Sequence, residues 1–251
     1  MRRALALVVS GALLGSACSG GGGGTPSRIT VLAAASLTDA FGLIGMQFER
    51  AHPGTGVRLA YGPSDGLARQ IQSGAPADVF ASASETWMDT VAGRPGVSDR
   101  ADFARNRLVV VVPSTNPAHI RSIDDLARPG IKLVLAAPGV PAGDYAREIL
   151  RKAGVERAAL VNVVSNEVDV RGVLAKLDMG DADAGIVYVT DAQSAGTGIS
   201  TIAIPPRLNV VATYPIAVVR GSPAPRVARA FVRFVLGPGQ LTLRDAGFLQ
   251  P

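Results

Sequence analysis

Ser64 is the residue with the clearest potential for covalent chemistry. It lies in Gly62-Pro63-Ser64-Asp65-Gly66, which matches the G-x-S-x-G nucleophile elbow and falls between an expected strand and an expected helix. A serine hydrolase also needs a general base, usually a histidine that follows in the chain. The only histidines are His52 and His119, and residues 120–251 contain none. A serine hydrolase is therefore the weaker interpretation, beside a tight turn that ends in a serine-capped helix.

Ser36 indicates binding instead of catalysis. It directly precedes a helix predicted by apolar residues at spacings of four, three and four, namely Leu37, Phe41, Ile44 and Phe48. We expect Ser36 to be the N-cap of that helix, after a strand over 28–33. Unpaired N–H groups at a helix start attract anions, and the small residues Ala33-Ala34-Ala35 allow close approach. Serine is a favoured N-cap without any ligand, so only repetition of this arrangement would indicate a site.

Several other kinds of chemistry find no support. Two histidines and one cysteine cannot form a metal-ligand cluster, and the acidic residues lack calcium-loop spacing. No glycine-rich phosphate loop follows an expected strand. The basic residues are scattered, and the formal charge of +5 falls to +3 when Arg2 and Arg3 are removed with the signal described below. We therefore expect no cofactor and no nucleic-acid partner.

The N-terminal segment predicts export and membrane attachment. Residues 1–17 carry two arginines, an apolar stretch and then small residues, as in a secretory signal peptide. Cys18, the only cysteine, resembles the lipidated first residue of a bacterial lipoprotein, although Gly15 occupies a position that is usually leucine. Residues 18–27 include five consecutive glycines and are expected to form a flexible tether.

The remaining chain alternates strands and helices, which predicts an α/β fold. Two proline-marked extended segments suggest two lobes joined by two crossovers, each lobe a mostly parallel sheet flanked by helices. We expect residues 28–112 plus 216–251 to form lobe 1 and 113–215 to form lobe 2. Ligands bind at the carboxyl ends of such strands, so helix N-termini should line the cleft. Strands are expected at 28–33, 57–61, 78–81, 108–112, 131–136, 160–164, 185–189 and 210–219, and helices at 37–48, 67–71, 82–91, 122–128, 143–153, 170–179, 225–236 and 241–248.

Six motifs, in this order, resemble those of the periplasmic molybdate-binding proteins of ABC importers. They lie at 33–37, 67–71, 74–83, 140–143, 169–174 and 185–192, and the similarity runs from about Arg28 to Pro251. That family has the two-lobed type II periplasmic binding-protein fold and holds a tetrahedral oxyanion between its lobes. The resemblance implies a monomeric extracytoplasmic receptor, not an enzyme. It would capture molybdate, and also tungstate, and deliver it to the membrane permease of an ABC importer.

Five residues of this chain match the family's oxyanion site. By this resemblance, Ser36 and Ser64 would donate hydrogen bonds from the first lobe, Ala142 and Val170 would donate backbone N–H groups from the second, and Tyr188 would donate its phenol. Four of the five positions fall where helix N-termini are expected, and these attract anions without lysine or arginine. A site made only of donors suits molybdate, whose oxygens only accept at neutral pH. Without the resemblance, Tyr188 would be an ordinary tyrosine at the edge of the core.

Asp65 departs from the family pattern, in which the residue after the second serine is usually small and neutral. A carboxylate beside a bound dianion would repel it. We therefore expect Asp65 to turn away, toward the N–H groups of its own helix or toward solvent. An acceptor in the wall would instead suit a protonated phosphate, so Asp65 keeps a phosphate receptor as an alternative. A sulfate receptor is the other alternative to a molybdate receptor.

Overall fold

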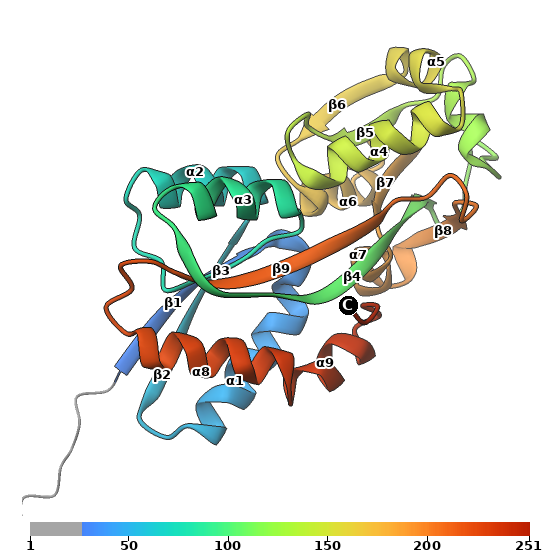
Figure 1. Cartoon of the computed structure of the whole chain (residues 1–251). Coiled ribbons are helices and arrows are strands. Elements are labelled where there is room, and N and C mark those ends of the chain that lie inside the picture. Colours follow the sequence, from blue (N-terminus) through green and yellow to red (C-terminus); the bar gives the residue numbers. More distant parts are fainter. Residues whose placement is uncertain (1–26) are drawn as a thin grey trace, which may run out of the picture.

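The computed structural model describes residues 27–251, so the predicted signal peptide, Cys18 and the glycine-rich tether lie outside the described residues. The strands of the described part are β1 (Ser27–Ala34), β2 (Thr55–Gly62), β3 (Val79–Ala81), β4 (Val97–Pro113), β5 (Leu133–Ala136), β6 (Val163–Glu167), β7 (Ala184–Tyr188), β8 (Ile199–Ala203) and β9 (Val211–Val219). Two lobes are joined by two crossings of the chain, one along β4, which pairs with strands of both lobes, and one that enters β9 (Figure 1).

Helices flank the sheet in both lobes. Those of the first lobe are α1 (Thr38–Ala51), α2 (Ser64–Gln72), α3 (Glu85–Gly93), α8 (Pro225–Leu236) and α9 (Gly239–Asp245). Those of the second are α4 (Pro141–Lys152), α5 (Glu156–Val161), α6 (Val170–Asp178) and α7 (Val189–Ser194). Short 3-10 turns are η1 (Ala35–Leu37), η2 (Ile123–Ala127) and η3 (Gly196–Gly198).

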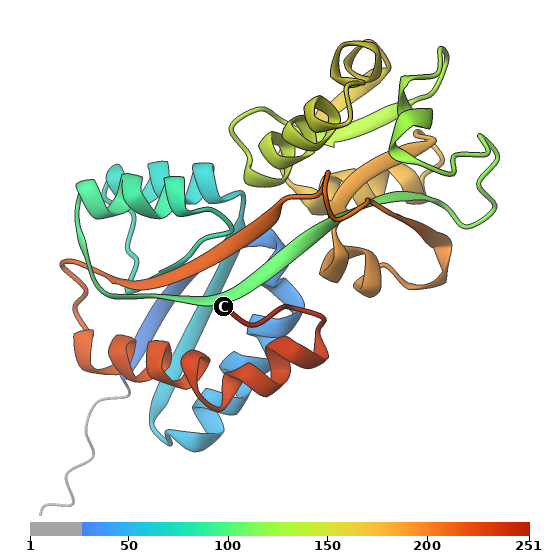
Figure 2. The same cartoon turned by 45° about the vertical axis from the view of Figure 1, so that its right-hand side comes forward.

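The strands β4 and β9 connect the lobes. The sheet order is β2-β1-β3-β9-β4-β7-β5-β6, and β8 also pairs with β4. From Val97 to Arg107, β4 pairs with β9, and from Leu108 to Pro113 it pairs with β7 and β8 (Figure 2). This two-lobed α/β arrangement confirms the predicted fold class. The lobe boundaries at 112/113 and 215/216 stay a prediction, because both strands continue unbroken past those points.

Parallel pairing is confined to the outer parts of the sheet. β1 pairs in parallel with β2 and β3, and β5 pairs in parallel with β6 and β7. Every pairing of β4 or β9 is antiparallel. The predicted parallel strands are therefore present in both lobes, but the crossover strands make the sheet mixed.

Several segments differ from the sequence prediction, among them the helices α5 and α7, which were not expected. The strand expected at 160–164 is wrong, because α5 continues to Val161 and β6 begins only at Val163. Its apolar residues do not form a buried strand, since Val161 and Val164 are exposed. The first half of β4, residues 97–107, was not predicted because charged, exposed side chains interrupt its apolar pattern. β8 was also missed, since its short sequence has only two large apolar residues.

The core supports the periodicity argument for the first helix. Phe41, Ile44 and Phe48 are fully buried, and the rings of Phe41 and Phe48 contact Phe231 of α8 at centroid distances of 6.1 and 5.3 Å.

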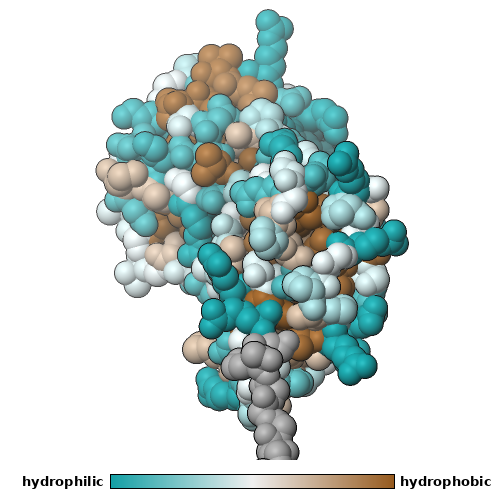
Figure 3. Space-filling view, turned by 90° about the vertical axis from the view of Figure 1, so that its left-hand side faces the viewer, coloured by the Kyte–Doolittle hydropathy of each residue, from teal (hydrophilic) through white to brown (hydrophobic). Residues whose placement is uncertain are grey.

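On the face in Figure 3, hydrophilic residues surround small groups of hydrophobic ones. Within residues 27–251, no helix has the length and apolar character needed to cross a membrane.

Candidate functional site

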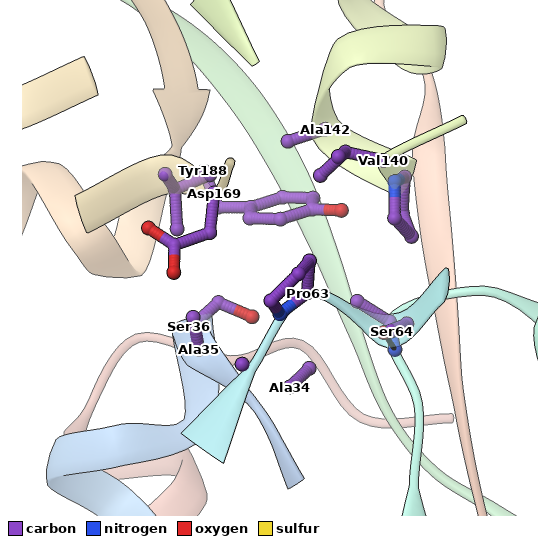
Figure 4. A pocket seen from close by; sticks show the side chains of 13 residues that line it. Ala34, Ala35, Ser36, Pro63, Ser64, Val140, Ala142, Asp169 and Tyr188 are labelled. Carbon is purple, nitrogen blue, oxygen red and sulfur yellow. Dashed lines mark hydrogen bonds between the residues drawn. The ribbon is translucent and has the colours of Figure 1, made fainter. Parts of the chain in front are cut away.

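A small cavity lies where the two lobes meet. Its volume of about 20 Å³ exceeds the roughly 10–15 Å³ that one water molecule needs. Ser36, Ser64, Ala142, Val170 and Tyr188 all line it (Figure 4). The structure thus brings the five residues singled out by the resemblance together. The other lining residues are Ala34, Ala35, Gly62, Pro63, Ala83, Val140, Pro141 and Asp169.

The cavity is surrounded by helix starts. α2 begins at Ser64, α4 at Pro141 and α6 at Val170, while Ser36 lies in the turn η1 that precedes α1. The first N–H groups of a helix have no partner within it and carry partial positive charge. No lysine or arginine of residues 27–251 lines the cavity. Its attraction for an anion therefore comes from backbone and hydroxyl donors.

The predicted role of Ser36 as an N-cap is wrong. Leu37 occupies the N-cap position of α1, and no side chain caps that helix. The 3-10 turn η1 separates the strand from the helix and buries Ser36, whose Oγ lies 2.9 Å from the hydroxyl oxygen of Tyr214. When Tyr214 is the donor of that bond, the Ser36 O–H is free to donate to a ligand.

Ser64 is not an N-cap either, because Pro63 occupies that position and Ser64 is the first residue of α2. Its Oγ accepts a hydrogen bond of 3.0 Å from the backbone N–H of Ala83, which leaves its own O–H free to donate. Neither His52 nor His119 lines the cavity. The structure therefore supplies no histidine base at Ser64, and its geometry does not support the hydrolase hypothesis.

The donors of the second lobe are positioned by backbone packing. The carboxylate of Asp169 caps α6 by accepting from the N–H groups of Arg171 and Gly172, at 2.9 and 3.1 Å. This arrangement leaves the N–H of Val170 without a partner within its helix. Asp169 lines the cavity, yet its carboxylate turns toward its own helix (Figure 4). Its capping role could have been predicted from an Asp before an apolar helical pattern.

The start of α4 lies unusually close to the end of β5. A Cβ atom at Gly143 would be 2.3 Å from the carbonyl oxygens of both Ala136 and Ala137. Only glycine allows this approach, because real Cβ atoms essentially never come within 3.0 Å of such atoms. Gly143 thereby fixes the position of the neighbouring Ala142 N–H at the cavity.

Tyr188 is the buried polar side chain that points into the cavity (Figure 4). It ends β7, is 2% exposed, and its hydroxyl has no hydrogen-bond partner within residues 27–251. Burial raises the pKa of Tyr188 well above its usual value. The phenol is therefore protonated at neutral pH and can donate to an acceptor in the cavity.

Asp65 turns away from the cavity, but its partner differs from the expected one. It is not among the lining residues, and its Oδ2 accepts a 2.8 Å hydrogen bond from Arg69 one helical turn later. The Arg69 guanidinium also lies 5.2 Å from the centre of the Trp87 ring. The negative charge of Asp65 is thus paired with the Arg69 side chain, and not exposed to solvent or directed at helix N–H groups.

Three contacts join the lobes around the cavity, and none was predicted from the sequence. The indole Nε1 of Trp87 donates to the carbonyl of Gly139 at 2.9 Å. Arg171 pairs with Asp39 at 2.6 Å. A longer hydrogen bond of 3.4 Å runs from the hydroxyl of Tyr145 to the carbonyl of Ala83. Each contact links a residue of the first lobe to one of the second.

Residues 29–249 match the family described as bacterial extracellular solute-binding protein. The chain is 42% identical over 230 residues to the molybdate-binding protein ModA of Mycobacterium tuberculosis H37Rv, covering 89% of this chain and 85% of that protein. It is 37% identical over 238 residues to ModA of Escherichia coli K12, covering 91% of each. The solved periplasmic molybdate-binding protein of Azotobacter vinelandii has a similar fold, with a TM-score of 0.78, 21% identity, and coverage of 89% and 99%.

Proposed function

Since the chain belongs to the family of bacterial extracellular solute-binding proteins, we propose that it captures molybdate outside the cytoplasm and delivers it to the permease of an ABC importer. The relatives named molybdate-binding protein ModA match over most of their length, which supports this choice of anion. Tungstate, an oxyanion of the same shape and charge, is proposed as a second ligand. The protein acts by binding, without catalysing a reaction and without a cofactor.

The proposal rests on the protonated phenol of Tyr188, which has no hydrogen-bond partner within residues 27–251 and lies in a cavity surrounded by helix starts. The hydroxyls of Ser36 and Ser64 and the N–H groups of Ala142 and Val170 complete a set of five donors. A molybdate dianion offers only acceptor oxygens, so it can satisfy every one of them. Backbone dipoles offset its charge without a lysine or arginine in the wall.

A phosphate receptor is the less favoured alternative. Hydrogen phosphate carries an O–H that needs an acceptor, and the carboxylate of Asp169 is already engaged by the N–H groups of its own helix. Asp65 is held by Arg69, away from the cavity. Sulfate has only acceptors, as molybdate does, and differs from it in size, so a direct comparison of the two anions is required.

A thermal-shift panel with molybdate, tungstate, sulfate and phosphate tests the proposal. A ligand at about 100 times its dissociation constant adds about 2.7 kcal/mol to the free energy of unfolding. We expect molybdate and tungstate to stabilise the protein most. Stabilisation by sulfate or phosphate alone would assign a different anion, and no stabilisation by any of the four would refute the oxyanion site.

Substitution of Ser36 by Ala tests the site itself. The change removes one hydrogen bond to a charged ligand, worth roughly 1.5–3 kcal/mol, or about ten- to a hundredfold in affinity. Calorimetric titration with molybdate measures the loss. The matched control is Ser114→Ala, at an exposed serine beyond the end of β4, which should bind as the wild type does. Equal affinities in the two variants would leave Ser36 with a structural role only.

Membrane attachment through Cys18 is proposed from the sequence, and the receptor is proposed to act as a monomer. Cys18→Ser should release the protein from the membrane fraction of the producing cell and abolish incorporation of labelled palmitate. A variant that stays in the membrane fraction would contradict the anchor. The molybdate affinity of Cys18→Ser should equal that of the wild type, since the five proposed donors all lie within residues 36–188.

A further inference from the structure

Asp191 is a buried carboxyl group of the second lobe. It lies in α7, three residues after Tyr188, and is 1% exposed. Within residues 27–251, neither of its carboxylate oxygens has a hydrogen-bond partner. Burial without donors disfavours the ionised form of a carboxyl group. Desolvation accordingly raises the pKa of Asp191 from 3.8 to about 7.

The surroundings of Asp191 contain more negative than positive groups. The charged and titratable side chains that face it are Arg171, Asp169, Asp39, Tyr188 and Tyr214. Arg171 and the backbone of Tyr188 favour ionisation, but desolvation outweighs both, and Arg171 already pairs with Asp39 across the lobes. Burial raises the pKa of both tyrosines well above their usual value, so both are neutral.

The remaining elements packed against α7 add no compensating charge next to Asp191. β4 faces α7 with the neutral Asn106, whose amide donates to the Thr190 hydroxyl at 2.9 Å. β8 contains no titratable residue. A bound dianion would therefore add a further negative charge to a region that already disfavours one.

We propose that Asp191 is the proton-linked residue of this site, so that capture of an oxyanion dianion is accompanied by uptake of one proton at its carboxyl group. This inference rests on the proposed function. Asp191 is close to the proposed anion, since it lies in the first turn of α7, directly after Tyr188, whose side chain lines the cavity. Two negative charges in one desolvated region repel, so the dianion and the ionised carboxylate disfavour each other. By reciprocity, the protonated receptor binds the anion more tightly.

The linkage predicts a specific pH dependence. If the bound dianion raises the pKa of Asp191 by about one unit, the affinity for molybdate falls by about tenfold between pH 6 and pH 9. The fall follows the loss of the Asp191 proton from the free receptor. Molybdate is a dianion throughout this range, so its own titration does not contribute.

Calorimetric titration with molybdate at pH 7.5, in buffers of different ionisation enthalpy, counts the protons taken up. We expect about half a proton per anion for the wild type, as follows for a group whose pKa rises by about one unit from near 7. Asp191→Asn should bind with no proton uptake and with a flat pH profile. Asp65→Asn is the matched control, because that carboxylate is also buried but paired with Arg69, and it should retain the uptake.

The outcomes separate this inference from the proposed function. Tight molybdate binding with no dependence on the buffer would overturn the role of Asp191 and leave the receptor assignment intact. Absence of binding by any oxyanion would overturn the receptor itself. If Asp191→Asn does not fold, carbon-13 NMR of the wild-type aspartate carboxyls can follow the titration of Asp191 directly. One carboxyl should titrate near pH 7 and shift upward with molybdate, and a spectrum without such a carboxyl would refute the proposal.

Discussion

The hydroxyl oxygens of Ser36 and Tyr214 lie 2.9 Å apart, although 178 residues separate them in the chain. Tyr214 is fully buried in β9, the strand that runs between the lobes. Burial raises the pKa of its phenol, which therefore keeps its proton at neutral pH. The crossover strand can thus donate to Ser36 and orient the Ser36 hydroxyl toward the cavity.

Tyr214→Phe should weaken molybdate binding by about fivefold, because a neutral buried hydrogen bond contributes roughly 1 kcal/mol. Calorimetry measures the change. Tyr61→Phe is a suitable control, since the buried Tyr61 hydroxyl has no hydrogen-bond partner within residues 27–251 and does not line the cavity. Equal affinities for the two variants would show that Ser36 is oriented without Tyr214.

Asp65→Asn should change molybdate affinity by less than about threefold. The Asp65 carboxylate already pairs with Arg69 and does not line the cavity, so only a screened, longer-range repulsion is removed. Titration of both proteins with molybdate and phosphate checks this. A wild-type preference for phosphate that is lost in the variant would count against the molybdate assignment.

Gly143→Ala should reduce molybdate affinity by more than about tenfold and lower the free energy of unfolding by about 1–3 kcal/mol. The added methyl group would meet the carbonyl oxygens of Ala136 and Ala137, so the start of α4 and the Ala142 N–H must shift. Urea unfolding and calorimetry report the two effects. Gly93→Ala, where a Cβ meets no atom within 4 Å, should change neither. An unaffected Gly143 variant would show that α4 can move without loss of the site.

The stability of the ligand-free protein should also depend on Asp191. Its pKa is about 7 in the folded protein and near 3.9 in an unfolded chain, so the folded state binds more protons between these values. The free energy of unfolding therefore falls as pH rises from about 4 to 7, by up to about 4 kcal/mol from this group. Urea unfolding of the wild type and Asp191→Asn between pH 5 and 8 measures it. Parallel profiles for the two proteins would mean that Asp191 titrates normally.

Local sequence patterns predicted most helices and the buried strands, because Phe41, Ile44 and Phe48 repeat with the helical period and the core segment of β4 is continuously apolar. They failed for the first half of β4, where pairing with β9 outweighs an exposed and charged sequence. The five site residues came from the resemblance, and local rules misassigned the two serines as N-caps. Tyr214 and Asp191 gave no local signal, since their significance depends on contacts between distant segments.

The position of β9 also bears on how the chain folds. This strand lies between β3 and β4, yet it follows the whole second lobe in the sequence. When the chain emerges from the ribosome N-terminus first, β5, β6 and β7 can pair early. The first lobe stays incomplete until the chain has emerged as far as about residue 219, the end of β9. Contacts between such distant residues slow folding. If the proposed signal peptide directs export, late closure of the first lobe would keep the polypeptide extended for longer and so ease its passage across the membrane.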